Sequence, residues 1–370
     1  MSKLVQSSVV LLVLTVIATA QIQKSPYNRI YVDEDYEYTE RERRKRTVND
    51  QLLKGLKAHK DGNHRAAANA FGIAVKIDPT VFEAQYNLGI AQINLGDYKS
   101  AAGSLENAAR LNNDSATAWH FLGFALYNGG NNAEAEKSFK RALDIDQSLG
   151  NTWSNLGQVY LESDKLNDAE AAFVKALESD PKLKEPVNGL CMTYARAKKA
   201  QQAVLYCTKA RSINSSLPIT YYLAWSYLDL KKYPEAINLL KDCVRLDPNR
   251  APFYTALAEG HFFMKRYKDA LVYAQKAVQV SPDSEAGYAG LGHIYFGMKK
   301  PKEAKRFFEK VLTIDPKSAS ARYNLAVTCL ALNERDCARE QYAILKHVEP
   351  NLSTQLFDHM YSDKVLRLVK

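Results

Sequence analysis

The chain contains 370 residues, of which 46% are hydrophobic and 25% are charged, a composition that excludes a wholly disordered protein and indicates an ordinary soluble one. Its formal net charge of +9 suggests acidic partners such as nucleic acid. However, the Lys and Arg residues are scattered along the sequence, so we expect them mainly on solvated helix surfaces and predict no nucleic-acid partner.

The first twenty residues, 1–20, have the form of a secretory signal peptide. Lys3 precedes an apolar run over residues 9–17, and an Ala-Thr-Ala triplet follows at residues 18–20. This pattern predicts cleavage before Gln21, because a membrane-spanning helix needs about 20 apolar residues. We therefore expect an extracytoplasmic protein, periplasmic or secreted. The alternative is a chain anchored in the membrane by an uncleaved N-terminal segment, the only case in which membrane contact is expected.

Residues 21–47 are predicted to form a flexible charged linker. An acidic, Tyr-rich stretch over residues 31–40 is followed by a cluster of Arg and Lys within residues 41–46. Opposite blocks of charge without a helical apolar period cannot bury a core of their own. We therefore interpret this segment as a solvated tether.

From residue 48 to residue 352 the sequence repeats with a period of 34 residues, and the fifth of nine copies is one residue short. Position 8 of each copy is always Gly, Ala or Cys, and position 20 is always Ala, from Ala67 to Ala338. Small side chains at two fixed places mark where two helices approach closely. We number the copies repeats 1 to 9, with bounds 48–81, 82–115, 116–149, 150–183, 184–216, 217–250, 251–284, 285–318 and 319–352.

Larger apolar residues and turn signals predict that each repeat is a helix hairpin. Leu recurs at position 7, as in Leu156, and Phe recurs at position 24, as in Phe173, both within patterns of helical spacing. Gly or a charged residue lies between the two helices, and six repeats end in Pro just before the next helix begins. The chain should therefore be all-α, built from antiparallel helix pairs.

This pattern resembles the tetratricopeptide repeat, most clearly in repeat 4 through Trp153, Leu156, Gly157, Tyr160, Ala169, Phe173, Ala176 and Pro181. Repeat 7 departs from it with Ala274 where Phe is usual. The resemblance covers about four fifths of the chain and implies a right-handed superhelical solenoid of about nine hairpins, whose first helices line a concave groove. Residues 353–370 are expected to form a C-terminal capping helix.

The cysteines lie at facing positions of two repeats. Cys191 and Cys207 hold positions 8 and 24 of repeat 5, and Cys329 and Cys337 hold positions 11 and 19 of repeat 9. Residues of an antiparallel hairpin face each other when their positions sum to about thirty, so we predict two disulfides, which an oxidising compartment permits. Cys243 would remain free. The alternative is that all five are small buried hydrophobes.

Sequence signatures of catalysis and metal binding are absent. There is no Gly-rich phosphate loop, Gly-x-Ser-x-Gly elbow, His-Glu-x-x-His helix or Cys-x-x-Cys pair. His261 and His293 lie on first helices of adjacent repeats, but isolated helical His residues usually pack or face solvent. We predict a non-enzymatic protein without metal or cofactor. A role as the recognition half of a glycosyl transferase would need a catalytic domain that this chain lacks.

The resemblance also implies where ligands bind, because family members usually contact partners through first-helix positions 2, 5, 6, 9, 12 and 13. Asn87, Asn155 and Asn324 share position 6, where Asn hydrogen-bonds the backbone of extended peptides in some relatives. The alternative is that the rings pack between helices and the amides are merely solvated. The aromatic candidates at these positions are Tyr86, Phe124, Tyr127, Tyr221, Tyr222, Trp225, Phe262, Phe263, Phe296 and Tyr323.

Together these features predict a protein-protein interaction scaffold that binds an extended peptide or protein segment in the concave groove. The alternative is a structural assembly factor for envelope, pilus or secretion machinery that docks folded partners. A eukaryotic secretory origin stays open beside a bacterial one, because Asn113, Asn214 and Asn351 begin formal glycosylation triplets.

Overall fold

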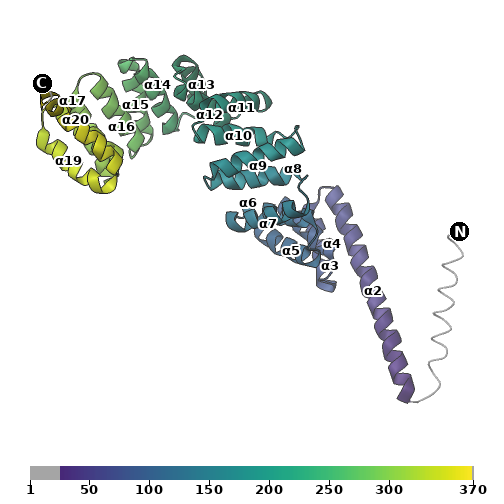
Figure 1. The fold of residues 1–370 in the computed structure, drawn as a ribbon. Coiled ribbons are helices and arrows are strands. Elements are labelled where there is room, and N and C mark those ends of the chain that lie inside the picture. Colours follow the sequence, from purple (N-terminus) through teal and green to yellow (C-terminus); the bar gives the residue numbers. More distant parts are fainter. Residues whose placement is uncertain (1–25, 369–370) are drawn as a thin grey trace. The chain divides into compact units, whose positions relative to one another are not determined.

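The computed structural model describes the backbone of residues 26–368 and side chains over residues 37–361. The described residues form α-helices joined by short turns, without strands (Figure 1). They divide between Ser148 and Leu149 into two compact bodies, an N-terminal body and a C-terminal body. The predicted signal peptide lies outside the described residues.

The N-terminal body contains repeats 1 to 3. Its helices pack as consecutive hairpins, α2 with α3, α4 with α5 and α6 with α7 (Figure 1). The bounds are α2 (Pro26–Lys60), α3 (His64–Ile77), α4 (Phe82–Asn94), α5 (Tyr98–Leu111), α6 (Ala116–Asn128) and α7 (Asn132–Ile145).

The C-terminal body contains repeats 4 to 9, in which each odd-numbered helix packs on the even-numbered helix before it. The bounds are α8 (Gly150–Glu162), α9 (Leu166–Ser179), α10 (Glu185–Arg196), α11 (Ala200–Ile213), α12 (Leu217–Asp229), α13 (Tyr233–Leu246), α14 (Ala251–Phe263), α15 (Tyr267–Val280), α16 (Glu285–Gly297), α17 (Pro301–Ile314), α18 (Ala319–Ala331), α19 (Arg335–Val348) and α20 (Pro350–Leu368).

Helix α2 corrects the prediction of a flexible linker. Over residues 26–47 the chain is helical and continuous with the first helix of repeat 1. Local ion pairs accompany this helix, with Arg43 Nη2 3.0 Å from Glu40 Oε1 and Lys45 Nζ 2.9 Å from Glu42 Oε1. Such i,i+3 pairs between good helix formers favour a helix without any apolar stripe, which is why the apolar period missed it.

Each hairpin turns at position 15 through a residue with positive φ. Repeats 1 to 3 have Gly there, for example Gly62 with φ of 74°, followed by an Asn or Asp side chain that caps the next helix. Repeats 4 to 9 have other residues in the same conformation, for example Lys265 and Lys299, both with φ of 59°. The turns of the C-terminal body are therefore strained relative to glycine.

The two small positions of the repeat are where the paired helices meet. All nine Ala residues at position 20 are fully buried, from Ala67 to Ala338. At position 8 of repeat 4, a Cβ atom on Gly157 would lie 2.7 Å from Cδ1 of Phe173 at position 24. Real Cβ atoms essentially never come within 3.0 Å of such an atom, so glycine is required beneath the ring.

Repeats 5 and 9 contain the two disulfides expected from the spacing. Cys191 and Cys207 are joined between α10 and α11 with a Cα–Cα distance of 4.6 Å, at the positions that hold Gly and Phe in repeat 4. Cys329 and Cys337 are joined between α18 and α19 with a Cα–Cα distance of 6.0 Å. Cys243 is free, and burial raises the pKa of its thiol to about 11.

Helix α20 packs against the last hairpin. It begins at Pro350, three residues before the predicted capping helix, and its fully buried Leu356 joins a core cluster with Leu345 of α19. The end of repeat 9 is thereby covered. Among the described residues, no helix is both long enough and apolar enough to cross a membrane.

Candidate functional site

A cavity of about 410 Å³ opens on the first helices of repeats 6, 7 and 8, within the C-terminal body. Most of its lining residues occupy the ligand positions that the family resemblance implies. One of them, Ala274, comes from the second helix α15. The lining residues are Trp225, Thr255, Ala256, Ala258, Glu259, Phe262, Phe263, Ala274, Ala286, Gly287, Ala289, Gly290, His293 and Ile294.

Small side chains create this cavity. Ala258 and Ala274 occupy positions 8 and 24 of repeat 7, where repeat 8 places Gly292 and the buried ring of Phe308. Two methyl groups fill less of the space between the helices than a ring does. On α16, the segment 286–290 adds further short side chains to the lining.

Aromatic rings with fixed orientations surround the cavity. Phe263 is 51% exposed, yet its ring stacks on Tyr233 at a centroid distance of 5.5 Å and an interplanar angle of 11°. Phe262 meets Phe263 edge-on at 5.4 Å. Trp225, 39% exposed, meets Tyr221 edge-on at 5.9 Å. Because neighbouring rings hold them, these side chains lose little conformational entropy when a ligand binds.

Tyr221 and Tyr222 are placed differently. The ring of Tyr221 lies 5.1 Å from Phe253 of α14 and 6.1 Å from Tyr222, and burial is the main cause that raises the pKa of Tyr221 to about 12. Tyr222 also packs against the core cluster of this region. Both residues support the rings around the cavity and do not line it.

The remaining candidates of the C-terminal body lie away from the cavity. Phe296 is 37% exposed on α16, and Asn155 is half-buried on α8. The ring of Tyr323 lies 6.3 Å from His359 of helix α20. Asn324 hydrogen-bonds the side chain of His293, which lines the cavity. Asn324 therefore orients a lining residue.

The two histidines noted in the sequence face their own second helices. His261 is 6% exposed and stacks on Tyr273 of α15 at 5.2 Å, with Nδ1 3.7 Å from Asp269 Oδ2. The ring of His293 lies 5.3 Å from Phe308 of α17. Burial lowers the pKa of both imidazoles.

The candidates of the N-terminal body are mostly engaged within it. The ring of Tyr86 stacks on Phe82 at 5.6 Å and meets Phe121 of α6 edge-on at 6.0 Å. Asn87 donates from Nδ2 to the backbone oxygen of Glu83 at 2.7 Å. Tyr86 therefore packs between first helices, and the amide of Asn87 bonds its own helix. The other two candidates, Phe124 and Tyr127, are half-buried on α6.

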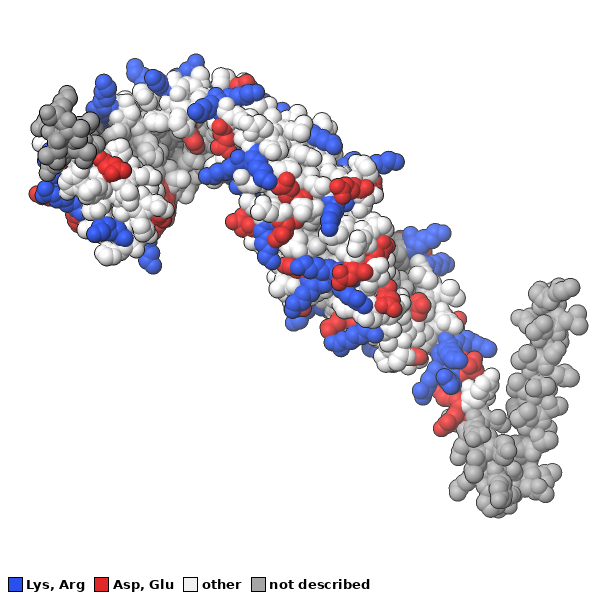
Figure 2. Space-filling model, in the orientation of Figure 1, with Lys and Arg blue, Asp and Glu red and all other residues white. Residues whose placement is uncertain are grey.

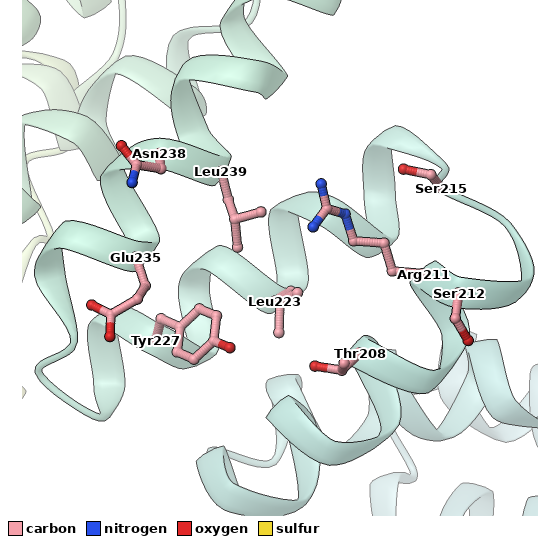
Figure 3. A pocket seen from close by; sticks show the side chains of 9 residues that line it. All are labelled: Thr208, Arg211, Ser212, Ser215, Leu223, Tyr227, Glu235, Asn238 and Leu239. Atoms are coloured by element: carbon pink, nitrogen blue, oxygen red, sulfur yellow. The ribbon is translucent and has the colours of Figure 1, made fainter.

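A second cavity, of about 610 Å³, was not expected from the sequence (Figure 3). It lies between α11, α12 and α13, with Leu223 and Leu239 on its apolar side and Arg211 and Thr208 among its polar groups. The loop before α12, residues 214–216, is the place where repeat 5 lacks one residue. That deletion is the signal that could have drawn attention to it.

Among the described residues, one group brings possible metal ligands together, and charges of both signs share the surface. Lys and Arg are interspersed with Asp and Glu over the face drawn in Figure 2. Cys329, Glu334 and Cys337 have ligand atoms within 4.8 Å of one another, but the two sulfurs are joined in the disulfide. They therefore offer no thiolates to a metal ion.

Consecutive helix hairpins of this kind define an α-solenoid, a class of fold that presents extended surfaces to partners. Sequence models of the tetratricopeptide repeat match residues 52–110, 114–182, 220–250 and 295–355, together more than half of the chain. The protein belongs to the tetratricopeptide repeat family. Members typically act as non-enzymatic scaffolds for other proteins, and in this general sense the chain is a protein-interaction scaffold.

Solved structures share the fold at low sequence identity. The crystal structure of the APC/C hetero-tetramer Cut9-Hcn1 matches with a TM-score of 0.53 and 14% identity, over 85% of this chain and 76% of that chain. YrrB, a TPR protein with an unusual peptide-binding site, matches with a TM-score of 0.46 and 18% identity, over 50% and 96%. PilF of Pseudomonas aeruginosa matches with a TM-score of 0.46 and 19% identity, over 58% and 98%. No curated protein matches the sequence.

Proposed function

We propose that this protein binds an extended peptide or protein segment across helices α12, α14 and α16, with the cavity beside Trp225, Phe262 and Phe263 as its anchoring site. The observation that carries the proposal is the coincidence of two independent features. The cavity follows from atomic packing, and the ligand positions are those that the family resemblance implies, yet most residues that line the cavity occupy such positions. Rigid rings around a concave apolar site are the usual anchors of a bound partner.

The size of the cavity favours an extended segment over a folded partner. A volume of about 410 Å³ lies near the lower end of the range for small-molecule clefts, about 300–1,000 Å³. It therefore accommodates one or two side chains. A segment that continues along the adjacent first helices would add contacts at the same repeat positions, as in other helix-repeat grooves.

We further propose an extracytoplasmic location, periplasmic or secreted. The form of residues 1–20 supports it, and so do the two disulfides within repeats 5 and 9. Disulfides persist in oxidising compartments and are rare in the cytosol. Intact mass of the protein after secretion, with free thiols alkylated, tests this. A chain starting at Gln21 with one alkylated Cys is expected, and an uncleaved chain with five alkylated Cys contradicts it.

Selection from a random dodecapeptide library on the purified protein tests the binding function. We expect the library to enrich certain peptides, and we expect these peptides to bind the protein in solution when they are synthesised with a dye label. Trp225→Ala should weaken them at least about tenfold, because truncating an anchoring aromatic typically costs more than 1 kcal/mol. Phe357→Ala is the matched control, since Phe357 is a similarly exposed ring on α20, 46% exposed. Peptides that bind equally to the Trp225→Ala variant would contradict the proposal.

A further inference from the structure

The ligand positions of repeats 6 to 8 are acidic within a basic protein. The chain as a whole carries a formal charge of +9, yet these eighteen positions include two carboxylates, Asp229 and Glu259, and no Lys or Arg. Glu259 lines the cavity together with one other ionisable group, His293, and burial lowers the pKa of His293, which favours its neutral form. The charge of this surface is therefore opposite to that of the chain.

Glu259 and Asp229 are both exposed, and of the two only Glu259 lines the cavity. Within the described residues, neither carboxylate has a hydrogen bond or an ion pair, although the charge of Lys198 acts on Asp229. Burial, and secondarily the charge of Asp229, raises the pKa of Glu259. Two like charges that raise each other's cost of ionisation favour an incoming cation.

The rings around Glu259 suit the rest of a basic side chain. Trp225, Phe262 and Phe263 line the same cavity as the Glu259 carboxylate. Aromatic faces attract an ammonium or guanidinium group, and they also cover the aliphatic stem of Lys or Arg. An acidic side chain would meet Glu259 with like charge, and a purely apolar side chain would cover the exposed Glu259 carboxylate without giving it a partner.

We infer that the cavity takes a basic side chain, Lys or Arg, from the bound segment. Its stem lies against Trp225, Phe262 and Phe263, and its charge lies beside Glu259 and Asp229. This inference rests on the proposed function, because it names the side chain that the proposed peptide inserts. It commits to a basic, extended peptide as the occupant on grounds of charge complementarity.

The test uses the peptides selected from the random library and their variants. We expect a Lys or Arg at one fixed place in the enriched sequences. If that residue is Arg, it is replaced by citrulline, its neutral isostere, and if it is Lys, it is replaced by Gln. Either change should weaken binding to the wild-type protein about tenfold or more. Glu259→Gln should weaken the original peptide by a similar factor. Glu178→Gln, at an exposed residue of α9, is the control and should bind as the wild type does.

A double-mutant cycle then locates the charge. If the basic group lies beside Glu259, citrulline or Gln in the peptide should cost little further affinity against the Glu259→Gln protein. Independent losses that multiply would overturn the inference. Enriched peptides without a basic residue that still depend on Trp225 would overturn the inference and leave the proposed function standing. A library that yields no Trp225-dependent peptide would reject both.

Discussion

The hairpins of repeats 7 and 8 use the same two positions in opposite ways. In repeat 8, Gly292 on α16 lies under the buried ring of Phe308, and a Cβ at residue 292 would come within 2.6 Å of that ring. In repeat 7, Ala258 and Ala274 meet at these positions, and the space between α14 and its neighbours is a cavity. One hairpin is filled, whereas the other has room for a ligand.

This difference shows how a repeat protein can form a binding cavity while it keeps its fold. Both hairpins keep the buried Ala at position 20 and the strained turn at position 15. At the two facing positions, the ring at position 24 is exchanged for a methyl group and the glycine at position 8 for alanine. The scaffold tolerates this because each hairpin also packs on its neighbours, so a loss within one interface is shared.

Removing the ring from the filled hairpin should have the largest effect. Phe308→Ala is expected to lower the free energy of unfolding by about 3–5 kcal/mol, because a fully packed ring is lost and a cavity is left. Urea denaturation followed by circular dichroism measures this as a shift of the midpoint. A loss below about 1 kcal/mol would show that position 24 does not hold the hairpin together.

Repeat 5 fills the same two positions with a disulfide. The double variant Cys191→Ala with Cys207→Ala should lose about 3 kcal/mol, the value for closing a loop of about 15 residues, and dithiothreitol should produce at least that loss in the wild type, because it also reduces the Cys329–Cys337 disulfide. Thermal unfolding with and without the reductant measures both. An unchanged transition would mean that packing alone holds this hairpin.

Filling the open hairpin should remove binding and spare the fold. Ala274→Leu extends a side chain toward the cavity, so selected peptides should bind about tenfold more weakly or worse. Overpacking a filled core typically costs about 1–3 kcal/mol. The free energy of unfolding should change by less than this, since the added methyl groups enter existing space. Val272→Leu on the same helix is the control, because Val272 is 63% exposed. Full affinity in the Ala274→Leu variant would place the peptide elsewhere.

The strained turns, which both hairpins share, should give the smallest change. Lys265→Gly and Lys299→Gly each relieve a left-handed conformation, and each should raise the free energy of unfolding by about 0.5–1 kcal/mol. Gly96, already glycine at this position in repeat 2, shows that the turn accepts it. A destabilisation would indicate that the Lys side chains make contacts that offset the strain.

Much of this architecture could be predicted from the sequence, because similar residue types recur at positions 8, 20 and 24 of the repeats. The facing Cys pairs followed from the same arithmetic. Helix α2 could not be predicted this way, because its stretch over 26–47 is supported by ion pairs between neighbouring turns, for example Arg43 with Glu40, and has no apolar stripe.

The site was predictable only as a set of positions. The period places Tyr86, Tyr221 and Trp225 alike on first helices, but it does not tell which ring faces a ligand. That depends on neighbours from other repeats, such as Phe253 beside Tyr221. The cavity itself depends on Ala274, which stands where the repeat usually has Phe. The sequence shows this departure, but only the packing of the neighbouring helices shows that it leaves a cavity.

The most direct test of the central claim is a crystal structure of the protein with the tightest selected dodecapeptide. We expect the peptide to run across α12, α14 and α16, with one side chain inserted among Trp225, Phe262 and Phe263. A peptide seated instead in the second cavity, beside Arg211, or on the N-terminal body, would contradict the assignment of the binding site.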